Sequence, residues 1–160
     1  MRDYLELCKP RISLLVVIMT LFGYALAGGT RGPIILWTLL GAGLASCACG
    51  ALNQWLEKEQ DALMRRTAGR PLPSERLRPR QALAFGLCAA AAGLLILFLG
   101  SLRPCFWLTA FTLAAYILLY TPLKRLTPQA TWIGAAAGAT PPLIGWAAAG
   151  GGLDVRAWTL

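Results

Sequence analysis

Five long apolar runs alternate with short polar stretches along the chain of 160 residues. No charged residue falls inside any of these runs, which cover residues 12–28, 34–52, 82–100, 105–123 and 130–150. Their lengths are close to the roughly 20 residues that a helix needs to cross a bilayer. Because hydrocarbon offers no partner to backbone N–H and C=O groups, each span must be helical. The pattern therefore predicts an all-α membrane protein with five transmembrane helices.

The second run continues into a polar segment that contains no helix-breaking residue. Residues 53–67 hold neither glycine nor proline, whereas Gly69 is a natural C-terminal stop and Pro71 cannot continue a helix. We predict one helix over 34–67 whose last turns leave the membrane on the cytoplasmic side. The predicted helices are 12–28, 34–67, 82–100, 105–123 and 130–150, within a single transmembrane domain over residues 1–160.

The last run contains Thr140-Pro141-Pro142 near its middle. Proline removes a backbone hydrogen bond from a helix interior and breaks or kinks the helix. A broken helix at membrane depth is tolerated where it is buried or lines a cavity. We therefore expect a break here and consider this run a candidate wall for a binding pocket, although a purely structural kink explains the prolines equally well.

Composition and charge narrow the function classes and indicate an orientation. Hydrophobic residues make up 57% of the chain and charged residues 14%, which excludes disorder and leaves too little polar surface for a soluble fold. The net charge of +8 comes from loops between apolar runs, so we expect no nucleic-acid partner. Twelve lysines and arginines fall on one predicted side and three on the other. This asymmetry predicts a multi-pass protein of the inner (cytoplasmic) membrane with a cytoplasmic N-terminus.

Polar residues repeat every four positions at the end of the predicted second helix. Asn53, Glu57, Asp61 and Arg65 form one slowly drifting stripe, because four residues turn a helix about 40° past a full circle. Two carboxylates and an amide oxygen suit Mg²⁺, which proteins commonly hold through one or two carboxylates and substrate phosphates. A solvated helix end with charge pairs four residues apart explains the same spacing, so both interpretations stay open.

Cations lie around this stripe in the sequence. An arginine ends the stripe and two more come after it, two cations follow the fourth run, and one arginine precedes the first run. Guanidinium groups match phosphate oxygens in bidentate fashion. The same cations could instead serve only to fix the orientation of the chain in the membrane. Lys9, two positions before Arg11, has the same two interpretations. The candidate diphosphate-binding residues are Arg65, Arg66, Arg70, Lys124, Arg125 and Arg11.

A longer motif runs from Asn53 to Pro73: Asn-x-x-x-(Asp/Glu)-x-x-x-Asp followed by Met-x-Arg-Thr-x-x-Arg-Pro-Leu. It resembles the first acidic motif of the UbiA-type intramembrane prenyltransferases. Three further stretches are similar to the branch of that family that farnesylates heme. They are Lys9 to Ser13, Thr127 to Gln129, and Gly134 to Trp146. The resemblance spans the whole chain.

The resemblance implies a bundle of about nine helices and a reaction. Members of this branch transfer farnesyl from farnesyl diphosphate to a vinyl group of heme B, with addition of water, to give heme O and diphosphate. By the same resemblance Asn53, Glu57 and Asp61 would be the catalytic residues and would hold Mg²⁺ on the diphosphate. The implied partners are farnesyl diphosphate, heme B, the lipid bilayer, and heme A synthase or the oxidase assembly machinery.

The sequence departs from the family pattern at two points. Glu57 stands where many members have aspartate, and the only acidic residues after Asp61 are Glu75 and Asp154, so a second acidic motif does not occur. We expect the chain to be the N-terminal half of such a bundle, truncated at its C-terminus. The alternatives are a related prenyltransferase that acts on an aromatic or quinone precursor, and a non-catalytic membrane protein.

Overall fold

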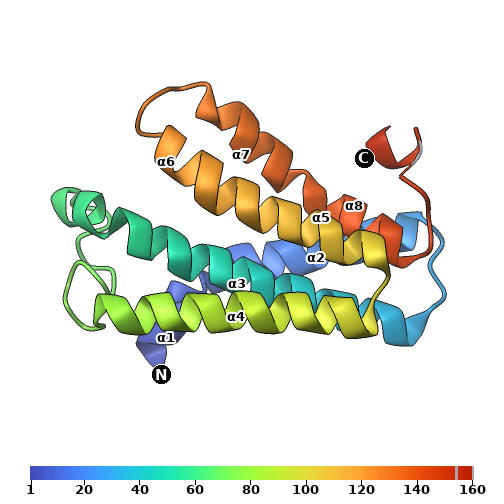
Figure 1. Cartoon of the computed structure of the whole chain (residues 1–160), viewed down its shortest axis with the longest axis horizontal. Helices are drawn as coiled ribbons and strands as arrows, with labels where there is room; N and C mark the ends of the chain where they lie inside the picture. The colour runs from blue at the N-terminus through green and yellow to red at the C-terminus, as the bar shows by residue number, and fades with distance from the viewer. Residues whose placement is uncertain (154, 160) are drawn as a thin grey trace.

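A computed structural model describes residues 1–153 and 155–159, which contain helices and turns but no strand. The chain begins with a short helix, α1, continues through α2 and three longer helical segments, and ends in a broken C-terminal pair, α7 and α8 (Figure 1). In order, the elements are α1 (Arg2–Leu7), α2 (Pro10–Leu26), α3 (Gly32–Leu63), α4 (Pro79–Gly100), α5 (Arg103–Ala114), the π-helix η1 (Ala115–Tyr120), α6 (Thr121–Leu123), α7 (Ala130–Gly138), α8 (Thr140–Ala148) and the 3₁₀ turn η2 (Ala157–Thr159).

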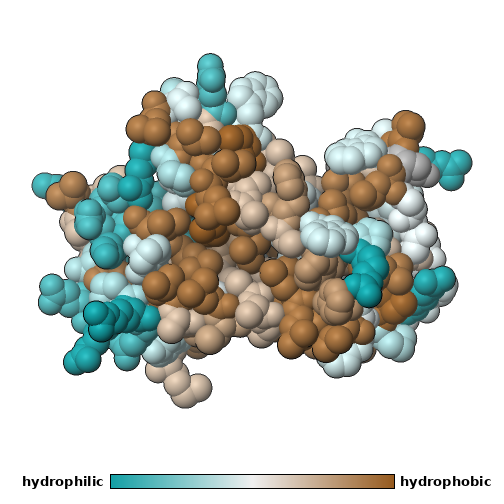
Figure 2. Space-filling model, viewed as in Figure 1, coloured by the Kyte–Doolittle hydropathy of each residue, from teal (hydrophilic) through white to brown (hydrophobic). Residues whose placement is uncertain are grey.

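Three helices are long and apolar enough to cross a membrane: α3, α4 and the continuous helix Arg103–Leu123, which consists of α5, η1 and α6. The helix α2 has 17 residues, and the last predicted span is divided between α7 and α8. The membrane character of the chain is therefore shown, while five complete crossings stay a prediction. Many large apolar side chains are exposed, as expected of a surface that faces lipid, and Figure 2 shows them as a broad band between polar ends.

The long helices run side by side, so the loops gather at two ends of the molecule (Figure 1). We call the end with residues 1–9, 64–78 and 124–129 the charged end, and the end with residues 27–31, 101–102 and 149–153 the far end. Hydrophilic residues cluster at the charged end in Figure 2. The segments predicted to be cytoplasmic thus share one end, and the side of the membrane that this end faces stays a prediction.

Small residues set the closest helix contacts. The helices α3 and α4 meet at Gly41 and Gly93, where a Cβ on Gly93 would lie 2.8 Å from the Gly41 carbonyl oxygen. The helices α2 and α8 cross at Gly23 and Gly145, and a Cβ on Gly145 would overlap the Thr20 carbonyl. Such close backbone approach through small residues is typical of helices packed in membranes, and here it folds α8 back against α2.

The last predicted span breaks where the prolines predict. The helix α7 ends at Gly138, and α8 begins at Thr140 with both prolines in its first turn. A missing backbone N–H is harmless there, because first-turn N–H groups have no partner within the helix. Most of α8 is buried, which is the setting that a broken helix at membrane depth requires.

The helix α3 ends at Leu63, four residues before the predicted end at Thr67. The Thr67 hydroxyl donates to the Asp61 carbonyl at 2.8 Å, and the Thr67 N–H donates to the Met64 carbonyl at 3.0 Å. These bonds replace the helical ones and turn the chain back. The predicted extension of the stripe to Arg65 is therefore wrong, since that residue follows the end of the helix.

The short helix α1 lies against the charged end of α3 and is absent from the sequence prediction. Arg76 forms ion pairs with Asp3 and, at 3.0 Å, with Glu6. The Gln54 amide donates to the carbonyls of Glu6 and Leu7, at 3.3 and 3.2 Å. The segment of residues 64–78 is thus connected to α1, and both cover this end of α3.

Candidate functional site

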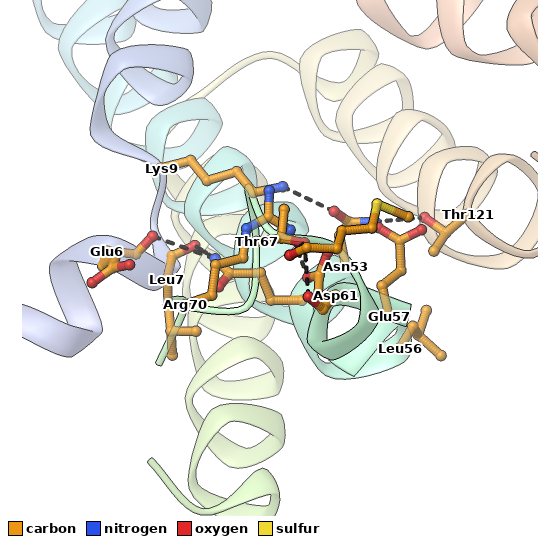
Figure 3. Close-up of polar contacts among 12 residues, drawn as sticks. Glu6, Leu7, Lys9, Asn53, Leu56, Glu57, Asp61, Thr67, Arg70 and Thr121 are labelled. Atoms are coloured by element: carbon orange, nitrogen blue, oxygen red, sulfur yellow. Dashed lines mark hydrogen bonds and ion pairs between the residues drawn. The ribbon is translucent and has the colours of Figure 1, made fainter. Parts of the chain in front are cut away.

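The last turns of α3 carry three polar side chains in one row. Asn53 is 2% exposed and Asp61 4%, and Glu57 is half-buried between them. The Asn53 amide donates from Nδ2 to Oε2 of Glu57 at 2.9 Å. Figure 3 shows the three side chains on the same side of the helix. We call them the acidic row.

Each member of the acidic row faces a cation from a different part of the chain. The Arg70 guanidinium pairs with the Asp61 carboxylate at 2.6 Å, and the Lys124 ammonium pairs with Glu57 at 2.8 Å. The Lys9 ammonium donates to Oδ1 of Asn53 at 2.8 Å. Three segments far apart in the sequence therefore bring positive charge to one short stretch of α3; Figure 3 shows two of the three cations, Lys9 and Arg70.

Lys9 differs from the other two cations in its surroundings. Burial lowers the pKa of its ammonium, and the nearby Arg70 and Lys124 lower this pKa further, whereas Glu57 and Asp61 raise it. Its bonded partner is a neutral amide rather than a carboxylate. The sequence allows a phosphate-binding role for Lys9 but does not indicate its contact with Asn53, because the two residues lie 44 positions apart.

A widened helical turn brings Thr121 to the acidic row. Residues 115–120 are π-helical, and Pro122 follows, which has no N–H to donate to a carbonyl four residues earlier. The Thr121 side chain is fully buried; its hydroxyl donates to the Tyr116 carbonyl at 2.8 Å and accepts from Asn53 Nδ2 at 3.4 Å. The Thr-Pro pair at the end of an apolar run is the sequence signal that could have indicated this turn.

The other predicted cations do not join this network. The Arg125 guanidinium donates to the Leu56 carbonyl at 2.7 Å, on the backbone of α3. Arg11, Arg65 and Arg66 are exposed, and their side chains form no hydrogen bond or ion pair with any residue that the structure describes. The structure thus brings together Arg70 and Lys124 from the predicted set, adds Lys9, and leaves the other assignments as predictions.

An apolar cavity of about 270 Å³ lies beside the acidic row, between α2, α3, α5, α7 and α8. Lys9 is the one charged residue among the described residues that line it. The opposite part of the lining includes Met19, Ala42, Thr109 and Ile144. Thr140 and Pro141 also line it, so the broken last span forms part of a cavity wall, as expected.

The donor set of the acidic row fits a hard divalent cation only in part. Carboxylate and amide oxygens are ligands that Mg²⁺ accepts, and phosphate oxygens and water commonly complete its coordination. Over residues 1–153 and 155–159, no group of three or more histidine, cysteine or acidic side chains could hold a metal ion. The row therefore suits a metal that shares its coordination with a phosphate ligand, rather than a metal held by protein alone.

Comparisons with known proteins place the chain among related sequences. The chain is 46% identical to the protoheme IX farnesyltransferase of Solibacter usitatus (strain Ellin6076), covering 100% of the chain and 59% of that protein. It is 46% identical to the Sinorhizobium fredii protein of the same name, over 99% of the chain and 51% of the relative. The Agrobacterium fabrum protein of this name is 47% identical over 96% of the chain and 49% of its own length.

The chain therefore spans about half the length of the relatives it matches. No solved structure gives a significant match. The family model described as the UbiA prenyltransferase family matches residues 16–160, which include the acidic row, Arg70 and Lys124. The chain belongs to the UbiA prenyltransferase family.

Proposed function

We propose that this chain carries the diphosphate-binding part of an enzyme that transfers farnesyl from farnesyl diphosphate to a vinyl group of heme B, giving heme O and diphosphate. The relatives described above bear the name of this activity. The observation that carries the proposal is the position of the acidic row, which is surrounded by three cations and lies at one end of an apolar cavity.

The geometry suits a substrate with an anionic head and an apolar chain. Lys9, Arg70 and Lys124 would bind the head, because charge-assisted hydrogen bonds to phosphate oxygens are among the stronger polar contacts in proteins. The farnesyl chain would occupy the cavity, where burial of apolar surface stabilises it. Lys9 belongs to both regions and would lie where head and chain meet.

The reaction begins with cleavage of the bond between the farnesyl carbon and the diphosphate oxygen, whose electron pair leaves with the diphosphate. Fixed positive charge at the acidic row stabilises that leaving group. The π electrons of the heme vinyl group form the new carbon–carbon bond, and water adds to the resulting cation and loses a proton. The apolar cavity keeps water away from the allylic carbon before the vinyl group attacks.

The proposal includes Mg²⁺ as cofactor, held by Asn53, Glu57 and Asp61 together with the diphosphate. When bound, the metal supplies positive charge to the departing diphosphate. We also propose that the enzyme is a multi-pass protein of the inner membrane, with five spans in this region of a bundle of about nine helices. Its charged end would face the cytoplasm, and its protein partners would be heme A synthase or the oxidase assembly machinery. Charge asymmetry between the loops supports that orientation.

A chimera provides the direct test. The chain would replace the 171 residues that align with it in the Solibacter usitatus protein, and membranes would receive farnesyl diphosphate and heme B. We expect heme O and diphosphate in equal amounts, and loss of both when Mg²⁺ is removed by chelation. A chimera that is inserted in the membrane at normal levels but makes no heme O would contradict the proposal.

The same membranes discriminate the alternatives. Replacing heme B by an aromatic acid or a quinone precursor should give no prenylated product. An aromatic product without heme O would favour the related branch of the family. Absence of farnesyl diphosphate binding by the chain itself would favour a non-catalytic membrane protein.

A further inference from the structure

A second cavity opens at the surface between α3, α4 and the segment of η1 and α6. We call it the outer groove, and its lining includes Leu56, Leu87, Leu118 and Arg125. Its volume is about 380 Å³, within the range of about 300–1,000 Å³ that is usual for ligand sites. The helix α5 contacts α4, and its continuation through η1 and α6 diverges from α4 toward the charged end (Figure 1). The groove lies in the space that this divergence leaves over α3, and its described lining shares no residue with that of the first cavity.

The lining of the outer groove is apolar along most of its length. Leu87 of α4 and Leu118 of η1 belong to it and are 54% and 68% exposed. Exposed apolar side chains of a membrane protein face lipid. Because lipid tails are about as apolar as leucine, this lining accepts an acyl chain but does not distinguish one lipid from another. Any selectivity must therefore come from polar groups at the end of the groove.

Arg125 is the one charged residue among the described residues that line the outer groove. It follows α6 at the charged end, is exposed, and donates to the Leu56 carbonyl at 2.7 Å, which holds its guanidinium over α3. Over residues 1–153 and 155–159, no carboxylate pairs with it. A guanidinium has five N–H donors and matches the geometry of phosphate oxygens. Arg125 thus keeps its charge and most of its donors for an anion.

The other charges near this end of the groove are mostly positive. Lys58 lies over the ring of Trp55, 6.0 Å from its centroid, and Trp55 lines the groove. Arg80 is exposed and lies three positions before Leu83 of the lining, on the same face of α4. Glu59, which is also exposed, follows Lys58 on α3. Together with the guanidinium described above, three cations stand against one carboxylate, and this balance favours an anionic ligand.

We propose that the outer groove binds an anionic phospholipid of the membrane: one acyl chain lies along Leu87 and Leu118, and the phosphate binds Arg125. Basic pockets between transmembrane helices bind anionic lipid headgroups in this way. The position of Arg125, where the apolar lining meets the charged end, matches a headgroup whose acyl chain stays in hydrocarbon. The inference does not depend on the proposed function, because neither the acidic row nor the first cavity takes part in it.

Native mass spectrometry of the full chain in detergent tests the proposal. The probes are palmitoyl-oleoyl phosphatidylglycerol and the phosphatidylcholine with the same acyl chains. We expect one phosphatidylglycerol to bind at least about fivefold more tightly than phosphatidylcholine, the attraction expected of one arginine near a headgroup. Arg125→Gln should remove this preference without changing the binding of phosphatidylcholine, whereas Arg125→Lys should keep the preference. Arg2→Gln is the matched control and should also keep it, because Arg2 is exposed at the same end but does not line the groove.

A second pair of variants tests the position of the acyl chain. Leu87→Trp places a larger side chain in the groove, so binding of both lipids should weaken several-fold. Leu95→Trp is the control, because Leu95 lies on the same helix outside the described lining and is 56% exposed. Equal lipid binding by the two variants would mean that no acyl chain lies in the groove, and the proposal would be wrong.

Four further results would each refute the lipid assignment. A parallel loss of both lipids in Arg125→Gln would mean that Arg125 only holds α6 against α3. Displacement of phosphatidylglycerol by inorganic phosphate would indicate a site for free anions. Displacement by heme B, which also joins an apolar body to carboxylates, would indicate a heme site. Absence of the preference for phosphatidylglycerol in the chimera would mean that the other helices of the bundle cover the groove.

Discussion

The charged end and the far end of this molecule are stabilised by different interactions. At the charged end, α3 buries Asn53 and Asp61, and side chains from three distant segments bond to the acidic row. Toward the far end, Tyr24, Leu97 and Ile144 belong to an apolar core. There α2 and α8 touch backbone to backbone. The difference suggests that substrate binding and stability can be changed separately, by substitutions at one end or the other.

The largest expected effect is at the charged end. Asp61→Asn removes one of the two carboxylates of the acidic row and its ion pair with Arg70. Loss of one preorganised electrostatic contact commonly lowers kcat by about 100-fold or more. Heme O formation by the chimera should fall by at least that factor. Glu59→Gln is the matched control, since Glu59 is exposed two positions earlier; equal turnover in the two variants would refute the site.

The second prediction concerns the cavity. Gly138 lines it, and a Cβ there would meet no atom within 4 Å, so Gly138→Leu adds volume without a backbone clash. The leucine side chain would displace about three methylene groups of the farnesyl chain from the cavity, and each of them loses about 0.8 kcal/mol of burial free energy. Binding of farnesyl thiodiphosphate should weaken roughly sixtyfold, whereas binding of inorganic diphosphate should not change. Gly32→Leu, in open space at the start of α3, is the control. Equal loss for both probes would show that the cavity does not hold the chain.

Arg70→Gln should have a moderate effect. A hydrogen bond to a charged group contributes about 1.5–3 kcal/mol, so the KM for farnesyl diphosphate in the chimera should rise by at least about tenfold. Arg80→Gln serves as control because Arg80 is exposed at the start of α4. A KM equal to that of the control would mean that Arg70 does not bind substrate and only helps to fix the orientation of the chain in the membrane.

The smallest expected effect is a gain in stability, whereas the substitutions above all reduce activity or binding. The Thr109 hydroxyl is buried in the cavity wall without a hydrogen-bond partner among the described residues. A buried polar group without a partner is destabilising, so Thr109→Val should stabilise the chain by about 1 kcal/mol, measured as a higher unfolding temperature in detergent. Thr112→Val should lower it, because the Thr112 hydroxyl bonds to the Leu108 carbonyl and to Thr140. Similar changes of unfolding temperature in both variants would contradict the difference in hydrogen bonding between Thr109 and Thr112.

The sequence predicts the apolar helices well because the signal is local. Charges are absent from the interiors of α2 and α4, and the predicted starts lie two and three residues inside the observed starts at Pro10 and Pro79. Proline explains the difference: it is favourable in the first turn of a helix, so both helices begin with it. The break between α7 and α8 is predictable for the same local reason.

The site is less predictable because its contacts are long-range. The spacing of Asn53, Glu57 and Asp61 indicates a shared face, and the family motif indicates Arg70. The partners Lys9 and Thr121 come from 44 and 68 positions away, and no local pattern encodes such a meeting. The end of α3 is missed because it depends on the Thr67 hydroxyl, which can bond to Asp61 only once the following loop has folded.

The contact of Arg76 with α1 has a consequence for biogenesis. The two ion pairs join residues 73 and 70 positions apart. A ribosome that has just released α1 has not yet made the arginine that holds it, nor Leu72 and Leu77, which pack around Leu7. Docking of α1, and with it the placement of the neighbouring Lys9, is therefore a late event, completed after α2 and α3 have left the ribosome. Assembly of the charged end would then coincide with the arrival of α4 rather than with insertion of the first helix.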